Sequence, residues 1–304
     1  MKIGVNLVNF GPGVTPESMA GWAERAESLG YHALLISDHV ATTTDVVARY
    51  PAPFYDPFTT LGWLAARTRR LELGTTVIVL PYRHPLHVAR LGANVDQLSG
   101  GRFILGVGVG WATQEFAALG VPFHQRGAIT DESLDVIRKF WATDVFSYSG
   151  RFVTCENVHT TPRPVRSPRP PIWIGGGSDA ALRRTVRYGD AWHPIRMRLD
   201  WLRERLAQMR KIADGEGKAM PALAPRIKVR LTDSAMPDDQ RLAGEGTLEQ
   251  IRADLRALES LGATHVTLDT YLDDPEATRD NRPAWQLLET IANRVLDLSR
   301  ETVR

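Results

Sequence analysis

The sequence predicts an α/β fold, and within that class a (β/α)8 barrel that forms a single domain over residues 1–304. Short runs of β-branched residues alternate with amphipathic helical stretches along almost the whole chain, as they do in βα units. Several runs are apolar on both faces, as Ile104–Val107 is, which suits a parallel strand covered on both sides. Eight such runs, each followed by a helix, favour the barrel. An open doubly wound sheet remains the alternative, because a strand count from sequence is uncertain by about one or two.

The predicted strands are, in order, Lys2–Val8, Ala33–Ser37, Leu71–Val79, Arg102–Val107, Pro171–Ile174, Ala191–His193, Arg226–Leu231 and Thr264–Asp269. Helical patterns lie between them, among them Pro16–Gly30, Pro57–Thr68, Pro85–Ser99, Asp131–Ala142, Ala180–Tyr188, Asp200–Gly215 and Leu248–Gly262. The first helix is the best defined, because its apolar residues recur at the helical period, Thr15 precedes it as a cap and Gly30 ends it.

Two segments interrupt this alternation. Val40–Asp56 follows the second strand as a long loop with Pro51 and Pro53, and we interpret it as a lid. Val145–Arg169, after strand four, holds a hairpin pattern around Ser149–Gly150 and then a proline-rich run. We expect the segment at about 145–169 to be an insertion within one domain rather than a linker between two.

Composition narrows the class of partner. Lys and Arg number 37 against 35 Asp and Glu, and no basic stripe with interleaved aromatic residues is evident, so no nucleic-acid partner is expected. No apolar run approaches the ~20 residues that span a bilayer, and the first residues do not resemble a signal peptide. The one cysteine, Cys155, leaves no partner for an intrachain disulfide. We therefore expect a soluble cytoplasmic protein with no membrane partner.

The segment that follows the fifth predicted strand is the most informative in the chain. The strand Pro171–Ile174 continues into Gly175-Gly176-Gly177 and Ser178, and then into the predicted helix Ala180–Tyr188. Glycines let the backbone approach a ligand, Ser178 is a favourable N-cap, and a helix N-terminus binds anions, most often phosphate. The alternative is a tight turn whose glycines serve packing alone.

In such a barrel the active site lies at the carboxyl ends of the strands, so polar residues there carry the most information. The second strand ends in Asp38 and His39. His39 is a candidate for proton exchange near neutral pH, and Asp38 is a candidate acceptor for a ligand N–H. The alternative is an Asp that caps a loop beside an incidental His. Because adjacent residues of an extended chain point to opposite sides, we expect only one of the two to face the pocket.

The fourth strand ends in Gly106-x-Gly108-x-Gly110-Trp111, with Glu115 further on. This is not a dinucleotide fingerprint, which requires G-x-G-x-x-G leading into a helix. We expect a close-packed strand end at which Gly108 lets a flat ring lie against the backbone. Trp111 is then either a wall of the ligand site or part of the core.

Other chemistries find little support in the sequence. The histidines are scattered, and His84 and His87 have no carboxylate in ligand register, so no metal site is expected. There is no G-x-S-x-G elbow of a serine hydrolase.

Four stretches, taken in order, carry a resemblance: Gly30-Tyr31-x-Ala33-Leu34-x-Ile36-Ser37-Asp38-His39; Leu73-Gly74-Thr75-Thr76-Val77; Asp96-x-Leu98-Ser99-Gly100-Gly101-Arg102-x-x-Leu105-Gly106-Val107-Gly108-x-Gly110-Trp111; and Ile172-Trp173-Ile174-Gly175-Gly176-Gly177. Together they resemble the bacterial luciferase-like monooxygenase superfamily, and within it the actinobacterial oxidoreductases that use the deazaflavin coenzyme F-420. The resemblance covers nearly the whole chain. It implies a (β/α)8 barrel with an insertion, a homodimer, and a flavin or deazaflavin bound at the strand carboxyl ends.

The resemblance also implies roles for single residues. Asp38 and the Thr76–Val77 peptide would lie against the deazaflavin ring, and that peptide would be a non-proline cis bond. Gly175, Gly176, Gly177 and Ser178 would hold the phosphate of the cofactor side chain. His39 matches a histidine with an acid/base role in the sugar-phosphate dehydrogenase branch. Trp111 stands where that branch has an acidic residue, so a sugar-phosphate substrate is not implied.

The function predicted from these observations is hydride transfer between the deazaflavin F-420 and a small organic substrate. His39 would donate or accept the proton, and Trp111 and His193 would line the substrate pocket. An FMN-dependent monooxygenase on the same barrel is the first alternative. A non-catalytic flavin-binding barrel is the second.

Overall fold

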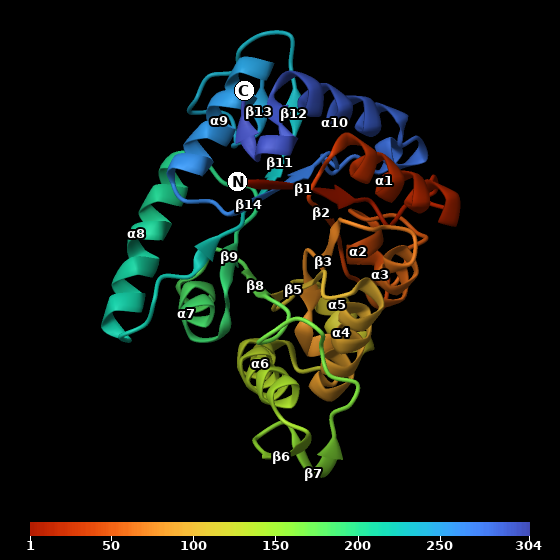
Figure 1. Ribbon diagram of the computed structural model, residues 1–304, viewed down its shortest axis with the longest axis vertical. Helices are drawn as coiled ribbons and strands as arrows, with labels where there is room; N and C mark the ends of the chain where they lie inside the picture. The colour runs from red at the N-terminus through yellow and green to blue at the C-terminus, as the bar shows by residue number, and fades with distance from the viewer.

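A parallel sheet forms the centre of the molecule in a computed structural model that describes all 304 residues. Its strands are β1 (Lys2–Leu7), β2 (Ala33–Ile36), β3 (Glu72–Thr75), β4 (Ile78–Val79), β5 (Phe103–Gly108), β8 (Ile172–Gly175), β9 (Ala191–His193), β10 (Ala222–Leu223), β11 (Arg226–Lys228) and β14 (His265–Asp269). The order is β10-β9-β8-β5-β3-β2-β1-β14-β11, with β4 paired to β5. The first and last strands of this order, β10 and β11, are separated in the sequence only by Ala224 and Pro225. The curled sheet therefore begins and ends on one continuous segment of the chain (Figure 1). The α/β class is confirmed.

The helices surround this sheet on its outer side (Figure 1). They are α1 (Pro16–Leu29), α2 (Thr44–Val47), α3 (Pro57–Ala65), α4 (Pro85–Ser99), α5 (Thr113–Ala118), α6 (Arg126–Ala142), α7 (Asp179–Tyr188), α8 (Leu199–Gly215), α9 (Leu248–Ser260) and α10 (Arg282–Arg294). The signals predicted for α1 are confirmed: Thr15 accepts a hydrogen bond from the Ser18 N–H, and Gly30 ends the helix at φ 90°. None of the helices combines the length and apolarity that crossing a membrane requires.

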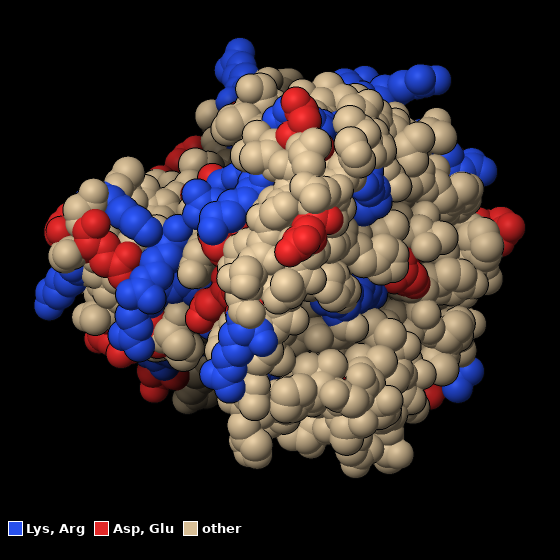
Figure 2. Space-filling model, turned by 90° about the horizontal axis from the view of Figure 1, so that it is seen from below, with Lys and Arg blue, Asp and Glu red and all other residues tan.

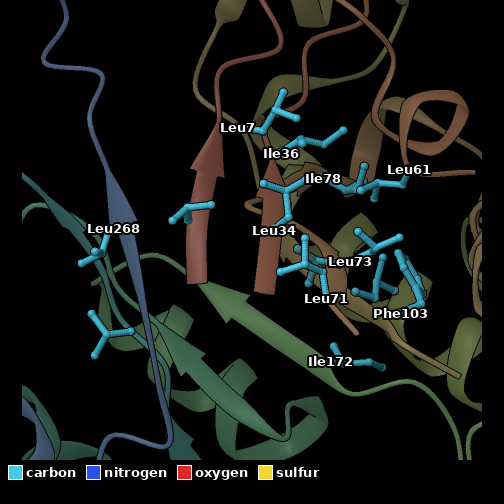
Figure 3. Close-up of a cluster of buried hydrophobic side chains, with 14 of the residues drawn as sticks. Leu7, Leu34, Ile36, Leu61, Leu71, Leu73, Ile78, Phe103, Ile172 and Leu268 are labelled. Carbon is cyan, nitrogen blue, oxygen red and sulfur yellow. The ribbon is translucent and has the colours of Figure 1, made fainter. Parts of the chain in front are cut away.

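The strand β2 shows how the sheet separates two cores. Its side chains alternate between the two faces of the sheet. Leu34 and Ile36 belong to the large cluster between sheet and helices, where Figure 3 shows them near Leu61 and Leu73. The intervening residues form the small inner cluster, whose members are Ala33, Leu35, Ile104, Trp173, Ala191 and Ala224. Because these apolar side chains fill the interior of the curled sheet, the polar side chains collect where the strands end.

Two predicted strands are wrong in their extent. Leu71–Val79 is divided into β3 and β4 at Thr76–Val77, where the peptide bond is cis, as the resemblance implied. The strand predicted at Arg226–Leu231 ends at Lys228, because the Arg230 N–H turns to the Gly244 carbonyl. Beyond Val229 the chain forms β12 (Arg230–Leu231), which pairs with β13 (Glu245–Gly246) outside the main sheet.

The helix predictions were wrong at several places. The helix α6 begins at Arg126 rather than Asp131, and the predicted Val40–Asp56 loop contains the short helix α2. No bounds were predicted for α5 or for α10, the helix after the eighth strand.

The hairpin predicted around Ser149–Gly150 is confirmed, since β6 (Val145–Ser149) and β7 (Thr154–His159) pair antiparallel. They form a separate sheet at the lower end of Figure 1. Glu132 of α6 holds the turn, because its carboxylate accepts the N–H groups of three consecutive residues, Arg151, Phe152 and Val153.

Charged side chains of both signs stand side by side on part of the face drawn in Figure 2, and a broad area of that face carries neither sign. Over the whole sequence the two signs are nearly balanced, with 37 basic and 35 acidic residues.

Candidate active site

A cavity of about 290 Å³ lies at the carboxyl ends of the parallel strands. Most of the residues predicted for the site line it: Asp38, His39, Thr76, Val77, Gly108, Trp111, Gly175, Gly176 and His193. The expectation that only one of Asp38 and His39 would face the pocket is wrong. The strand β2 ends at Ile36, so the two residues are not constrained to the alternation of an extended strand.

His39 is held by a carboxylate that was not among the residues predicted for the site. Its Nδ1 lies 2.6 Å from Oε2 of Glu115, a residue of α5 with no exposed surface. The other oxygen of Glu115 accepts the N–H groups of Val40 (2.6 Å) and Ala41 (3.0 Å). Burial raises the pKa of Glu115, but the hydrogen bond and charge of His39 and the two backbone N–H groups outweigh it, so the pKa is lowered.

The charge on Glu115 determines what His39 can do. An ionised carboxylate only accepts hydrogen bonds, so Nδ1 of His39 carries a hydrogen and donates it. The other ring nitrogen, Nε2, has no partner in the protein and remains available for proton exchange. The only sequence signal for Glu115 was an acidic residue just beyond a strand end.

Asp38 is committed to contacts within the protein. Its carboxylate accepts the Val79 N–H at 2.9 Å and a two-pronged contact from Arg83 at 2.7 and 2.8 Å. Burial lowers the pKa of Arg83, but the hydrogen bond and charge of Asp38 outweigh it and raise the pKa. Asp38 therefore fastens β4 to the end of β2, and a ligand N–H would have to share its oxygens. Arg83 was not predicted.

His193 lines the cavity as a neutral ring. Burial lowers its pKa to about 4. Its Nδ1 lies 2.5 Å from the Ala224 carbonyl, so that nitrogen donates, and Nε2 accepts from the Thr76 hydroxyl at 2.8 Å. Arg226 donates in turn to the carbonyl and hydroxyl oxygens of Thr76, at 2.6 and 3.1 Å. Since both ring nitrogens are occupied, His193 shapes the wall and is not available for proton exchange.

The side chain of Val77 explains why Gly108 and Gly175 are glycines. A Cβ on Gly108 would lie 2.7 Å from Cγ2 of Val77, and one on Gly175 would lie 3.3 Å from its Cγ1. The side chain that follows the cis bond therefore occupies the space that these glycines leave between β5 and β8.

The rest of the glycine segment combines packing with open backbone donors. A Cβ on Gly177 would lie 2.8 Å from the Trp201 ring, so packing explains that glycine, and neither Gly177 nor Ser178 lines the cavity. Ser178 caps α7 by accepting the Ala181 N–H at 3.2 Å, as predicted. The N–H groups of Gly176, Gly177 and Ser178 have no acceptor in the protein. Gly176 adopts φ 101°, which favours glycine.

Comparison with known proteins identifies the family. Residues 1–235 match the family model described as luciferase-like monooxygenase. An uncharacterized protein of Mycobacterium tuberculosis is 32% identical over 272 residues, which are 85% of this chain and 92% of the relative. The F420-dependent glucose-6-phosphate dehydrogenase of Amycolatopsis mediterranei is 30% identical over 184 residues, 58% of this chain and 53% of the enzyme.

Solved structures share the fold at low identity. The coenzyme F420-dependent tetrahydromethanopterin reductase of Methanopyrus kandleri superposes with a TM-score of 0.77 at 16% identity, over 99% of both chains. The oxygenating constituent of 3,6-diketocamphane monooxygenase of Pseudomonas putida, in complex with FMN, superposes with a TM-score of 0.75 at 17% identity, over 97% of this chain and 99% of that one. With a family model matched over residues 1–235 and a relative similar over nearly its whole length, the chain belongs to the luciferase-like monooxygenase family.

Proposed function

We propose that this protein is an oxidoreductase that transfers a hydride between the deazaflavin coenzyme F-420 and a small organic substrate, on a (β/α)8 barrel. The observation that carries the proposal is the position of His39. Its Nδ1 is fixed by Glu115 at 2.6 Å, while Nε2 is unpartnered at the cavity. A hydride transfer to or from a carbonyl group also moves a proton, and a positioned imidazole suits that task near neutral pH.

The residues present fit a flat ring with a phosphate-bearing side chain. Val77, Gly108 and Gly175 form a wall in which no side chain projects from the two glycines. The open N–H groups of Gly176, Gly177 and Ser178, with the N-terminus of α7, are suited to an anion. We infer that the first group of residues holds the ring and the second holds the phosphate.

The residues around the cavity then have separate tasks. When bound, the deazaflavin supplies the carbon, C5, that carries the hydride. Nε2 of His39 donates or accepts the proton, and Glu115 keeps the imidazole in the tautomer that this requires. Trp111 and His193 line the space left for the substrate. Trp111 is 41% exposed at the mouth, with Arg49 5.0 Å above its ring, and so shields the site from water on that side.

An FMN-dependent monooxygenase is the second candidate. It is favoured by the family description and by the FMN bound to a protein of similar fold. The backbone N–H groups of the glycine segment would donate hydrogen bonds to the phosphate of either cofactor. Binding therefore has to decide between the two.

The test is a titration of the purified protein with F-420 and with FMN, in which tryptophan fluorescence reports binding. We expect F-420 to bind with a Kd below about 1 µM and more tightly than FMN. Gly176→Val should weaken binding by tenfold or more. Gly100→Val is the matched control, because Gly100 also has a positive φ but lies at the carboxyl end of α4. A preference for FMN would support the monooxygenase, and binding of neither cofactor would contradict the phosphate site.

A further inference from the structure

The wall of the cavity at the end of β11 carries two buried cations. The side chains of Arg226 and Lys228 are 9% and 6% exposed. Both contact one carboxylate oxygen, Oδ2 of Asp269, at 2.8 Å from Arg226 and 2.7 Å from Lys228. The single negative charge of Asp269 therefore compensates only one of the two positive charges.

Asp269 has no capacity to accept more. Its Oδ2 also takes the Nε hydrogen of Arg226 at 2.9 Å, and Oδ1 accepts Nδ2 of Asn6 (3.0 Å) and the N–H of Tyr271 (3.1 Å). Burial raises the pKa of Asp269, but the charges and hydrogen bonds of Arg226 and Lys228 outweigh it and lower the pKa. The carboxylate is ionised and saturated.

The other charged side chains at the cavity do not neutralise this excess. Arg196 lines the cavity but pairs with Asp273, and Asp38 pairs with Arg83. Glu115 lies behind His39 and does not line the cavity, and its oxygens are taken by the imidazole and two backbone N–H groups. The two cations and one carboxylate at the end of β11 therefore carry a net positive charge that no other carboxylate at the cavity compensates.

Lys228, the last residue of β11, has a hydrogen to offer a ligand. Arg226 spends four of its five guanidinium hydrogens on Asp269 and Thr76 and keeps one on Nη2. The ammonium of Lys228 has three hydrogens and two acceptors in the protein, Asp269 and the Tyr271 carbonyl. Its third hydrogen is free, and the residue lines the cavity.

We propose that Lys228, supported by Arg226 and Asp269, forms an anion subsite of the cavity, and that this subsite binds the carboxylate of a small organic acid that is the substrate. A singly charged group matches the single uncompensated charge, and a buried cation gains most from an anionic partner. This inference rests on the proposed function, because it takes the cofactor phosphate to lie at Gly176–Ser178.

The test compares acids with their amides, which have nearly the same shape but no charge. Protein loaded with F-420 is titrated calorimetrically with acetate, propanoate and benzoate, and with acetamide, propanamide and benzamide. We expect at least one acid to bind tenfold or more tightly than its amide. Lys228→Met should abolish that difference and leave the affinity for F-420 within twofold. Lys211→Met, on the exposed side of α8, is the control and should change neither.

The outcomes separate this inference from the proposed function. Equal affinities for acid and amide, or an acid preference that survives Lys228→Met, overturn the subsite. If Lys228→Met loses F-420 affinity, the charge of Lys228 serves to bind the cofactor, and the proposed substrate subsite is overturned as well. If the wild-type chain does not bind F-420, the proposed function fails, and the same titrations on the unloaded chain still decide the subsite.

Discussion

At the scale of single residues, the site is governed by which hydrogen-bonding atoms are already occupied. Asp38, His193 and Asp269 are buried and saturated, so they position other groups. His39 and Lys228 each retain one unoccupied polar atom at the cavity, Nε2 in one case and an ammonium hydrogen in the other. Chemistry and recognition are expected at these two residues.

The pair of His39 and Glu115 gives the first prediction at this scale. His39→Ala should lower kcat about 10²- to 10⁴-fold, the usual worth of a general acid or base. Glu115→Gln should lower kcat less, by about tenfold or more, because the imidazole remains but loses its orientation. The measurement is consumption of reduced F-420 with a substrate found by screening acids. F-420 affinity should stay within twofold in both variants.

The double variant is the control for this interpretation. If Glu115 acts through His39, adding Glu115→Gln to His39→Ala should cost little more than His39→Ala alone. Fully additive losses would show that Glu115 has a separate role.

His193 gives a prediction on pH dependence. Its folded pKa, about 4, lies below the ordinary 6.5, so the unfolded chain binds more protons between these values. Stability from the neutral ring is therefore full above about pH 6.5 and is lost as the pH falls toward about 4. The wild type should lose about 2 kcal/mol more unfolding free energy between about pH 7 and pH 5 than His193→Gln does. Urea titrations at both pH values measure this, and parallel losses would contradict a neutral buried His193.

At the scale of elements, periodicity and capping located most strands and helices because these signals are local. Thr15 and Gly30 bracket α1 and Ser178 begins α7, and each acts on neighbours within a few residues. The break of the third predicted strand at Thr76–Val77 is different. Its sequence is as β-branched as a continuous strand, and only the resemblance signalled the cis bond.

Only the site residues that lie at the ends of strands could be predicted from the sequence. Asp38, His39, Gly108 and His193 follow or end strands, so the fold rule brought them to one cavity. Glu115 lies 76 residues from His39 in sequence, and no local pattern links the two. The same holds for the contact of Lys228 with Asp269, which depends on β11 pairing with β14.

The contact of Gly108 with Val77 gives a prediction for the elements β4 and β5. Gly108→Ala would place a methyl group 2.7 Å from Cγ2 of Val77, and overpacking of this kind costs about 1–3 kcal/mol. Val77→Ala removes that atom. We expect Gly108→Ala to lower the unfolding free energy and weaken F-420 binding, and the double variant to recover part of both. Urea unfolding with F-420 titration measures this, and strict additivity would show that Val77 is not the obstacle.

At the scale of the whole molecule, the two ends of the sheet have different roles. The carboxyl ends of the strands hold the cavity, whereas the amino ends hold an ion cluster around Glu72. Glu72 opens β3 and contacts Lys2, which opens β1, and His265, which opens β14, each at 3.1 Å. Arg166, from the proline-rich segment, reaches the same carboxylate at 3.3 Å. One side chain thus joins three strands and the segment beyond the hairpin, so its loss should be felt by the fold rather than by the cavity.

Glu72 gives the prediction that separates these roles. Burial raises its pKa, but the contacts with His265 and Lys2 outweigh it and lower the pKa to about 2. A lowered carboxyl pKa contributes stability that is present above the unfolded value and lost as the pH falls through the folded value. Glu72→Gln should therefore lower the unfolding free energy at neutral pH by about 1–3 kcal/mol, since solvent screens the partly exposed Lys2 and Arg166. The difference from wild type should shrink as the pH falls from about 4.5 toward 2, while F-420 affinity at neutral pH stays unchanged. Glu204→Gln, on the exposed side of α8, should alter neither property. A variant that kept its stability but lost F-420 affinity would show that the amino ends of the strands are coupled to the site and do not serve the fold alone.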